Sequence, residues 1–145
     1  MGSINILLIE DNPGDVELTR EGLINFGKLN NQLDVVTDGE EALNYLYKRG
    51  VYFNINSPDI ILLDLNLPKI DGREVLKAIK QDDTLGKIPV VVLSSSEAAT
   101  DIQHAYNLHA NCFITKPVQL DDFIKVIQMI EHFWIEIVRL PMKGD

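Results

Sequence analysis

The apolar residues of this chain of 145 residues gather in short runs that alternate with longer amphipathic segments. Runs of four to six residues that are apolar nearly throughout are typical of strands that are buried on both faces of a sheet. We therefore predict five strands, at residues 4–9, 33–36, 60–63, 89–93 and 112–115.

The segments between these runs repeat apolar residues at helical spacing. Asn12 followed by Pro13 is a favoured helix start, and Asp71 and Ser96 are side chains that can cap the helices after them. Gly27 and Gly50 suit helix ends. The predicted helices span about residues 13–26, 40–48, 72–80, 97–108 and 120–138.

Strand and helix thus alternate five times, which predicts an α/β fold with a doubly wound parallel sheet covered by helices on both faces. Ligands of such open sheets bind beyond the carboxyl ends of the strands. The residues at these ends are therefore the candidates for a site, and they are Glu10-Asp11, Thr37-Asp38, Asp64, Ser94-Ser95 and Lys116-Pro117.

The overall charge and the cysteine content exclude several classes of protein. A net charge of −9 and a pI of about 4.7 argue against direct binding to nucleic acid, which requires a basic face. The single cysteine, Cys112, cannot form an intramolecular disulfide, and with no signal peptide this favours the cytoplasm. No apolar run approaches the ~18 residues that a membrane span needs.

Three carboxylates, Glu10, Asp11 and Asp64, are expected to meet at one edge of the sheet. Like charges in a desolvated place repel each other, so such a cluster calls for a cation, and oxygen ligands in small number suit Mg²⁺. Lys116 and the Ser94 hydroxyl from neighbouring strand ends would suit a phosphoryl group. Each residue alone is compatible with a structural role, as a solvated strand end, a turn or a cap; their common position at one edge favours a site.

Four motifs together resemble the receiver domain of a two-component response regulator: LLIEDNPGDVELT, DIILLDLNLPKIDG, IPVVVLSSS and FITKP. The resemblance covers nearly the whole chain and implies a flavodoxin-like (βα)5 fold with strand order 2-1-3-4-5. We expect one receiver domain over residues 1–145 with a long last helix and no effector domain. The polar loop QDDTLGKIP and the tail HFWIEIVRLP are similar to those of stand-alone regulators paired with cyanobacterial phytochromes.

The resemblance implies a role for each residue at the strand ends. Asp64 would accept a phosphoryl group from a histidine kinase. Asp11, Asp64 and the backbone carbonyl of Asn66 would bind Mg²⁺ directly, and Glu10 would bind it through a water. Lys116 and the backbone N–H groups of Asn66 and Ser95 would contact the phosphoryl oxygens, with a cis peptide bond expected between Lys116 and Pro117.

Ser94 and Phe113 resemble the switch pair of the family, in which the hydroxyl turns toward the phosphoryl group and the aromatic ring moves inward. Phe113 could equally be an ordinary, partly buried strand residue. The sequence departs from the commoner family pattern at three positions, with Glu10 in place of Asp, Ser94 in place of Thr and Phe113 in place of Tyr. Asn66 could orient a hydrolytic water.

The last predicted helix carries more apolar surface than one domain should need. Its expected core face consists of Leu120, Phe123, Ile124, Ile127, Ile130 and Trp134. A second apolar stripe, Val126, Met129, Phe133 and Ile137, predicts a homodimer through this helix. Alternatively, the C-terminal extension folds back over that stripe.

We therefore expect a signalling protein that catalyses only its own phosphorylation and dephosphorylation. Its expected partners are a histidine kinase, of the phytochrome type by resemblance, and an unidentified downstream protein. One alternative is a phosphorylation-independent pseudo-receiver that only binds proteins. Another is a phosphatase of the haloacid dehalogenase type, although Asn66 stands where that class has its second Asp.

Overall fold

The computed structural model describes residues 4–25, 30–138 and 140. The strands are β1 (Ile4–Ile9), β2 (Asn31–Val36), β3 (Ile60–Leu63), β4 (Val90–Ser94) and β5 (Cys112–Thr115). The α-helices are α1 (Pro13–Arg20), α2 (Gly39–Leu46), α3 (Gly72–Gln81), α4 (Ala99–Asn107) and α5 (Leu120–Ile130). Short π-helical segments, η1 (Glu21–Asn25) and η4 (Glu131–Ile137), continue α1 and α5, and two 3₁₀ turns, η2 (Gly50–Tyr52) and η3 (Leu85–Lys87), lie in loops.

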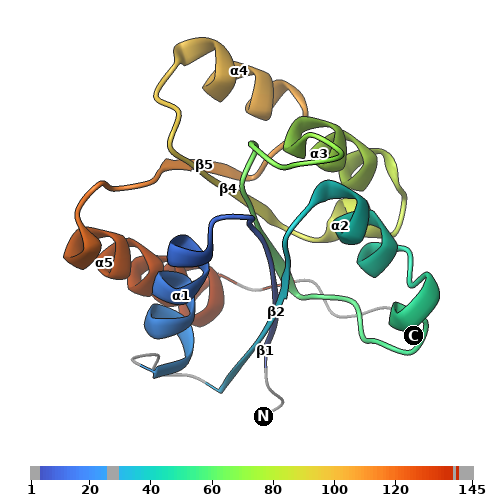
Figure 1. Ribbon diagram of the computed structural model, residues 1–145, viewed down its shortest axis with the longest axis horizontal. Helices are drawn as coiled ribbons and strands as arrows, with labels where there is room; N and C mark the ends of the chain where they lie inside the picture. Colours follow the sequence, from blue (N-terminus) through green and yellow to red (C-terminus); the bar gives the residue numbers. More distant parts are fainter. Residues whose placement is uncertain (1–3, 26–29, 139, 141–145) are drawn as a thin grey trace.

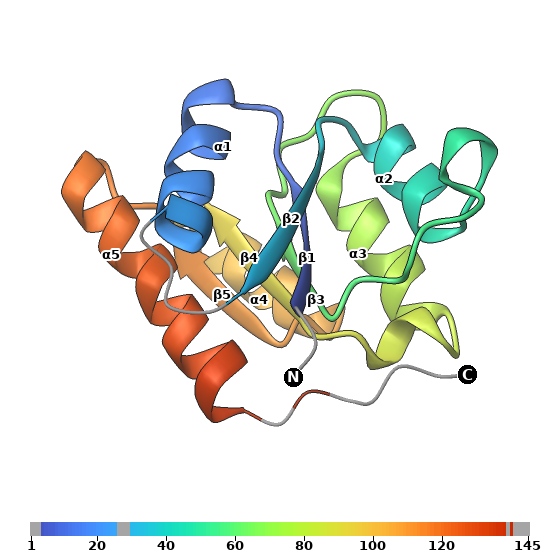
Figure 2. The same ribbon diagram turned by 90° about the horizontal axis from the view of Figure 1, so that it is seen from below.

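All five strands are parallel and lie in the order β2-β1-β3-β4-β5, so the predicted flavodoxin-like fold is confirmed. Helices α1 and α5 lie on one side of the sheet, and α2 and α3 lie on the other (Figures 1 and 2). Strand β1 lies between β2 and β3, and the chain reverses its direction of strand addition there. This switch point is where open parallel sheets bind their ligands.

The sheet separates two apolar cores. On one face, Leu7, Ile9, Ile61 and Leu63 pack against α2, α3 and α4, and on the other the alternate strand residues pack against α1 and α5. The three central strands contribute side chains to both cores, which explains why their sequences are apolar throughout. Each fully buried Leu or Ile contributes about 1.5–3 kcal/mol, so the strands are held firmly in register.

Several predicted details of the helices are wrong. Helix α4 is capped by Ala98, whose side chain makes no capping hydrogen bond. Ser96 lies two residues before this cap, and its hydroxyl accepts a hydrogen bond from the Ala98 N–H. Leu120 is 64% exposed although it was placed on the core face of the last helix, because it begins α5 and burial starts only at Phe123. The predicted helix end at Gly27 lies outside the described residues.

The first and last helices both end in a π turn that the sequence pattern did not predict. These turns flank a buried polar contact, in which the Asn31 side-chain amide donates to Glu131 Oε2 at 2.6 Å and to the Leu23 carbonyl at 3.1 Å. A π turn frees backbone carbonyls from the regular helical ladder. The Leu23 carbonyl is satisfied in this way by the start of β2, and this contact links η1 and η4 to the sheet.

The loop between β3 and α3 is clamped between two glycines. A Cβ on Gly72 would lie 2.4 Å from the Asp64 carbonyl oxygen, and one on Gly39 would lie 1.9 Å from the Ile70 carbonyl oxygen. The Gly72 N–H donates to the Leu65 carbonyl at 2.9 Å, and the Gly39 N–H donates to the Pro68 carbonyl at 3.2 Å. The backbone that follows Asp64 is therefore fixed by contacts that no larger residue permits.

We predict that Gly72→Ala destabilises the protein by roughly 1–3 kcal/mol, because the added methyl group must displace the backbone of Asp64 and Leu65. Urea unfolding measures the change. Gly14→Ala is the control, since Gly14 lies exposed in the first turn of α1 and its Cβ would approach only the Asn12 side chain, at 3.3 Å. Equal stability of Gly72→Ala and the parent would contradict the clamp.

Candidate functional site

The carboxyl ends of four strands bring the predicted residues together. Glu10 follows β1, Asp64 follows β3, Ser94 ends β4 and Lys116 follows β5. Backbone hydrogen bonds continue the sheet to these ends, with the Asp64 N–H donating to the Ile9 carbonyl at 3.0 Å and the Lys116 N–H to the Ser94 carbonyl at 2.7 Å. The site is thus an extension of the sheet.

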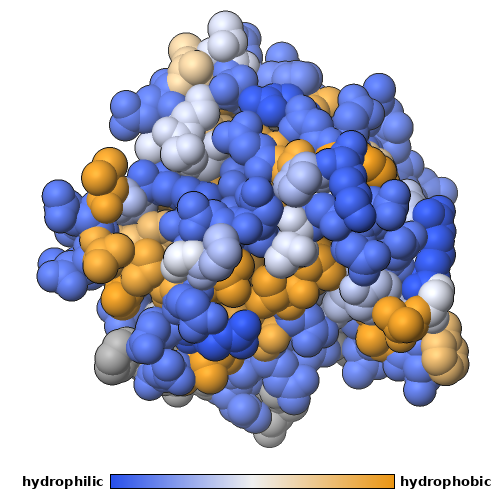
Figure 3. Space-filling model, viewed as in Figure 1, coloured by the Kyte–Doolittle hydropathy of each residue, from blue (hydrophilic) through white to orange (hydrophobic). Residues whose placement is uncertain are grey.

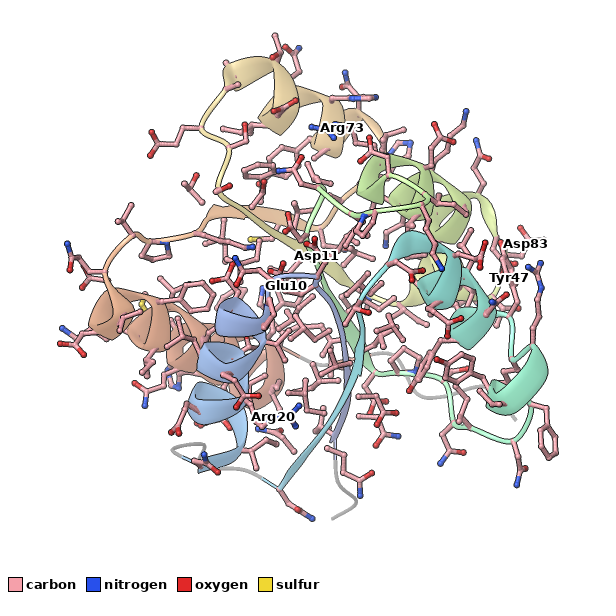
Figure 4. The ribbon with its side chains drawn as sticks, in the orientation of Figure 1. Glu10, Asp11, Arg20, Tyr47, Arg73 and Asp83 are labelled. Atoms are coloured by element: carbon pink, nitrogen blue, oxygen red, sulfur yellow. The ribbon has the colours of Figure 1, made fainter. Side chains whose placement is uncertain are left out.

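An acidic cluster occupies the centre of the site. Glu10, Asp11 and Asp64 each offer an oxygen within 4.8 Å of the others. Glu10 and Asp64 are buried and Asp11 is exposed, so one side of the cluster opens to solvent. Figure 4 shows Glu10 and Asp11 side by side where β1 leads into α1. An all-oxygen set of this size, partly open to water, fits a divalent cation such as Mg²⁺.

The ammonium group of Lys116 balances part of this negative charge. Its Nζ lies 2.5 Å from Glu10 Oε1, 2.8 Å from Asp15 Oδ2 and 3.1 Å from Asp64 Oδ2, and its side chain is only 8% exposed. Burial alone would lower the pKa of Lys116, but hydrogen bonds to Asp15 and Glu10 and the charge of Asp64 overcome this and raise it. Lys116 is therefore a fixed positive charge in this site.

Glu10 responds in the opposite way to the same surroundings. Burial and the neighbouring Asp64 carboxylate raise the pKa of Glu10 from 4.5 to about 7, although the Lys116 ammonium opposes the shift. Glu10 Oε2 also accepts a hydrogen bond from the Asn12 N–H at 3.3 Å. The crowding of carboxylates is thus costly to this group, and a cation bound to the cluster would relieve the cost.

Backbone groups complete the surroundings of Asp64. The Asn66 N–H donates to Asp64 Oδ1 at 3.1 Å, which fixes the plane of the carboxylate. The Ser94 side chain is fully buried, and its hydroxyl accepts from the Ser96 N–H at 3.3 Å. Ser95 is exposed beside it.

The peptide bond between Lys116 and Pro117 is trans, since residues 4–25, 30–138 and 140 contain no cis bond, and the predicted cis bond is wrong. The trans isomer is also the intrinsically favoured one.

A hydrogen-bonded chain that the sequence did not predict runs from the site to two helices. The Ser96 hydroxyl donates to Asp101 Oδ2 on α4 at 2.7 Å, and Asp101 Oδ1 accepts from Arg73 of α3 at 3.0 Å. The Ser96 hydroxyl and Arg73 together lower the pKa of Asp101. In Figure 4, Arg73 lies between α3 and α4. Phe113 is connected to α4 as well, because its N–H donates to the Tyr106 hydroxyl at 3.1 Å.

The contact between Asp15 and Lys116 is the second one that the sequence did not predict. Asp15 is the third residue of α1, after the cap at Asn12, and it reaches a lysine 101 positions later. A side chain in the first turn of a helix that follows an acidic strand end points back toward that strand end. This spacing was the available signal.

Exposed apolar side chains lie at three places on the surface. Val118 and Leu120 lie just before and at the start of α5, Met129 and Phe133 lie near the end of α5 and in η4, and Tyr47, Val51 and Phe53 form a patch after α2. Figure 3 shows apolar surface over the start of α5 and over the turn that follows α2. Of the predicted stripe on the last helix, Met129 and Phe133 are exposed and Val126 is half-buried, while the side chain of Ile137 lies outside the description. None of the described helices is both long and apolar enough to span a membrane.

Comparisons with known proteins find sequences and structures that resemble this chain. A sequence model of the response regulator receiver domain matches residues 6–128. Response regulator Rcp1 from Synechocystis sp. is 46% identical over 136 residues, which are 94% of this chain and 92% of that protein.

Two solved structures share the fold over nearly the whole chain. The phosphorylated cyanobacterial phytochrome response regulator RcpA is 48% identical with a TM-score of 0.94, over 97% of this chain and 100% of that one. The Mn²⁺-bound form of Rcp1 is 46% identical with a TM-score of 0.92, over 96% and 99%.

We predict that a divalent cation binds this cluster about ten-fold more weakly at pH 6 than at pH 8. Glu10, with a pKa of about 7, is mostly protonated at pH 6, so the cation must displace a proton there but not at pH 8. Titration calorimetry with Mn²⁺ measures both the affinity and the proton release.

Two variants test the assignment of this proton to Glu10. Glu10→Gln should flatten the pH dependence. Asp83→Asn, which removes a charge from an exposed residue far from Glu10 and Asp11 (Figure 4), should leave it unchanged. An affinity that is the same at pH 6 and pH 8 in the parent protein would count against the prediction.

Proposed function

This chain belongs to the response regulator receiver domain family, and we propose that it accepts a phosphoryl group on Asp64 from a histidine kinase of the phytochrome type. One observation carries the proposal: Asp64 is a buried carboxylate held between the Lys116 ammonium at 3.1 Å and the Asn66 N–H at 3.1 Å, beside two further acids. The phytochrome pairing is supported by the likeness to RcpA, which is a phytochrome response regulator.

The proposed reaction needs positioning and charge neutralisation more than covalent assistance. An Asp64 oxygen forms the new O–P bond while the N–P bond of the kinase's phosphohistidine breaks, and the electron pair of that bond stays with the ring nitrogen, which takes up a proton. Mg²⁺, held by Asp11, Asp64 and the Asn66 carbonyl, with Glu10 acting through a water, would supply charge neutralisation. Hydrolysis of the acyl phosphate by water returns the carboxylate and releases phosphate.

Lys116 and the neighbouring backbone groups hold the transferred group. Lys116 already donates to Asp64 Oδ2. Whichever oxygen of Asp64 takes the phosphoryl group, the ammonium needs little movement to reach a phosphoryl oxygen. The N–H groups of Asn66 and Ser95 would contact the other oxygens. The fixed positive charge of Lys116 favours the dianionic product over free Asp64.

The presence of the complete set argues against the alternative functions. A pseudo-receiver typically lacks an acid or the lysine, whereas Glu10, Asp11, Asp64 and Lys116 converge here. A haloacid dehalogenase needs an acid two residues after its nucleophile, and the exposed Asn66 at that position cannot supply a proton. We propose that the protein acts in the cytoplasm as a phosphorylation-operated signalling protein.

We further propose that Ser94 and Phe113 transmit the phosphorylation. If Ser94 turns its hydroxyl to a phosphoryl oxygen, it releases the Ser96 N–H, and Ser96 in turn holds Asp101 of α4. One charge-assisted hydrogen bond supplies roughly 1.5–3 kcal/mol. A switch from 1:99 to 99:1 requires about 5.5 kcal/mol. Ser94 therefore has to act together with Lys116, the cation and the repacking of Phe113.

The exposed stripe of α5 is proposed to join two copies of the chain. Phe133 is 51% exposed and Met129 67% exposed, and Phe133 packs edge-on against Trp134 with ring centroids 5.6 Å apart. Val126 lies half-buried beside them. A self-complementary apolar stripe on one helix suits a symmetric dimer, in which each copy covers the other's stripe. A downstream protein, so far unidentified, would read the remaining surface.

We predict that acetyl phosphate with Mg²⁺ labels the parent protein at one position and that Asp64→Asn abolishes the labelling. Mass spectrometry after borohydride trapping locates the site. The control Asp59→Asn changes another aspartate, which lies just before β3 at the end opposite Asp64, and should keep the labelling. If Asp64→Asn is labelled as strongly as the parent, or if the parent is not labelled, the proposed function is wrong.

We predict that Phe133→Glu produces a monomer that still accepts a phosphoryl group, because a charge at the centre of the stripe cannot be desolvated without cost. Sedimentation velocity with and without beryllofluoride measures the association. Phe53→Glu is the matched control, since Phe53 is 76% exposed in the patch after α2 and should leave the dimer intact. A parent protein that is monomeric under both conditions at high micromolar concentration disproves the dimer.

A further inference from the structure

We infer that Asp15 is a positioning residue that controls how strongly Lys116 holds the phosphoryl group; this inference rests on the proposed function of Asp64. An ammonium group has three N–H donors. In this structure the nitrogen lies within 3.1 Å of three carboxylates, those of Glu10, Asp15 and Asp64. Asp15 is the one member of the three that lies outside the acidic cluster with the geometry of a cation site.

The position of Asp15 is built into the start of α1. Its N–H donates to Asn12 Oδ1 at 3.1 Å, and its carbonyl accepts from the buried Thr19 hydroxyl at 2.8 Å. Asp15 is therefore fixed at the first turn of the helix, and only 21% of its side chain is exposed. A carboxylate in this position also interacts favourably with the helix N-terminus, but that role does not require a contact with Lys116.

The three carboxylates have different fates when the site is filled. A cation at the cluster draws on Glu10 and Asp64, and the phosphoryl group converts the Asp64 carboxylate to an acyl phosphate. Asp15 takes part in neither event, so it keeps its hold on Lys116 throughout. One donor of Lys116 thus stays committed to Asp15, which orients the ammonium toward Asp64.

The charge of Asp15 also opposes the phosphoryl group. Asp15 Oδ2 lies 2.8 Å from the Lys116 nitrogen that must also bind the phosphoryl oxygens, in a site where solvent screening is weak. Its negative charge neutralises part of the ammonium and repels a second anion. Asp15 therefore limits the affinity of the site for a phosphoryl group and, for the same reason, increases its affinity for a cation.

These two effects separate a charge role from a merely structural one. Asp15→Asn keeps the shape of the side chain and an oxygen that can accept from Lys116, but it removes the charge. We expect beryllofluoride, in the presence of saturating Mg²⁺, to bind Asp15→Asn about three- to ten-fold more tightly than the parent, the range between a charged and a neutral hydrogen-bond partner. Mn²⁺ alone should bind the variant more weakly.

Glu17→Gln is the matched control, because Glu17 lies on the same helix and carries the same charge. Its side chain is 71% exposed and forms an ion pair with Arg20 at 3.8 Å, so water and salt screen it from the site. Both affinities should stay within two-fold of the parent. Asp15→Glu, which restores the charge, should return both affinities toward the parent values, and urea unfolding verifies that each variant is folded.

The outcomes distinguish this inference from the proposed function. Asp64→Asn is expected to bind no beryllofluoride. If the parent protein also binds none, the proposed function is overturned and the inference with it. If the parent binds beryllofluoride but Asp15→Asn lowers the affinity for both beryllofluoride and Mn²⁺, or changes neither affinity, only the role of Asp15 is overturned. The inference is supported if Asp15→Asn binds beryllofluoride more tightly and Mn²⁺ more weakly than the parent and Glu17→Gln shows neither change.

Discussion

The buried ammonium of Lys116 is the interaction on which this site depends. Without it, Glu10, Asp15 and Asp64 would face one another as uncompensated charges in a place that water barely reaches. Burial and the neighbouring Asp64 carboxylate raise the pKa of Glu10 even though the Lys116 ammonium opposes the shift. Three carboxylates surround this one ammonium, so negative charge is in excess. An excess of negative charge suits a divalent cation, and the fixed ammonium suits the phosphoryl group that we propose for Asp64.

The fold holds these charges together by backbone contacts. The ladder continues past the strands to Asp64 and Lys116, so their positions follow from strand register. Gly39 and Gly72 then clamp the loop after Asp64 from two helices. Side chains that repel one another are therefore held close by parts of the chain whose stability comes from elsewhere, mainly from the apolar cores on the two faces of the sheet.

The same site is connected to the surface that would carry a signal. Ser96, Asp101 and Arg73 link the end of β4 to α4 and α3, and Tyr106 of α4 accepts the N–H of Phe113 on the edge strand. Movement of Ser94 would therefore be felt first at the start of α4. Among the described residues, helix α4 has a single buried hydrophobic residue, Ala105, so it is held to the sheet by less apolar surface than α3. That makes it the helix on which a change of polar contacts has the largest relative effect.

Local periodicity and the alternation of strand and helix were enough to predict the five strands, the five helices, their order along the chain and the residues at the strand ends. The order of the strands in the sheet was implied by the resemblance to receiver domains. Cap geometry and the ends of helices were less predictable: Ala98 and not Ser96 is the cap of α4, and α1 and α5 both continue as π turns. Only the tertiary structure decided that Asp15 shares Lys116 with Glu10 and Asp64, and that Leu120 lies exposed. Such contacts join residues that are far apart in the chain, and a pattern of apolar and polar positions does not record the distances between side chains that packing brings together.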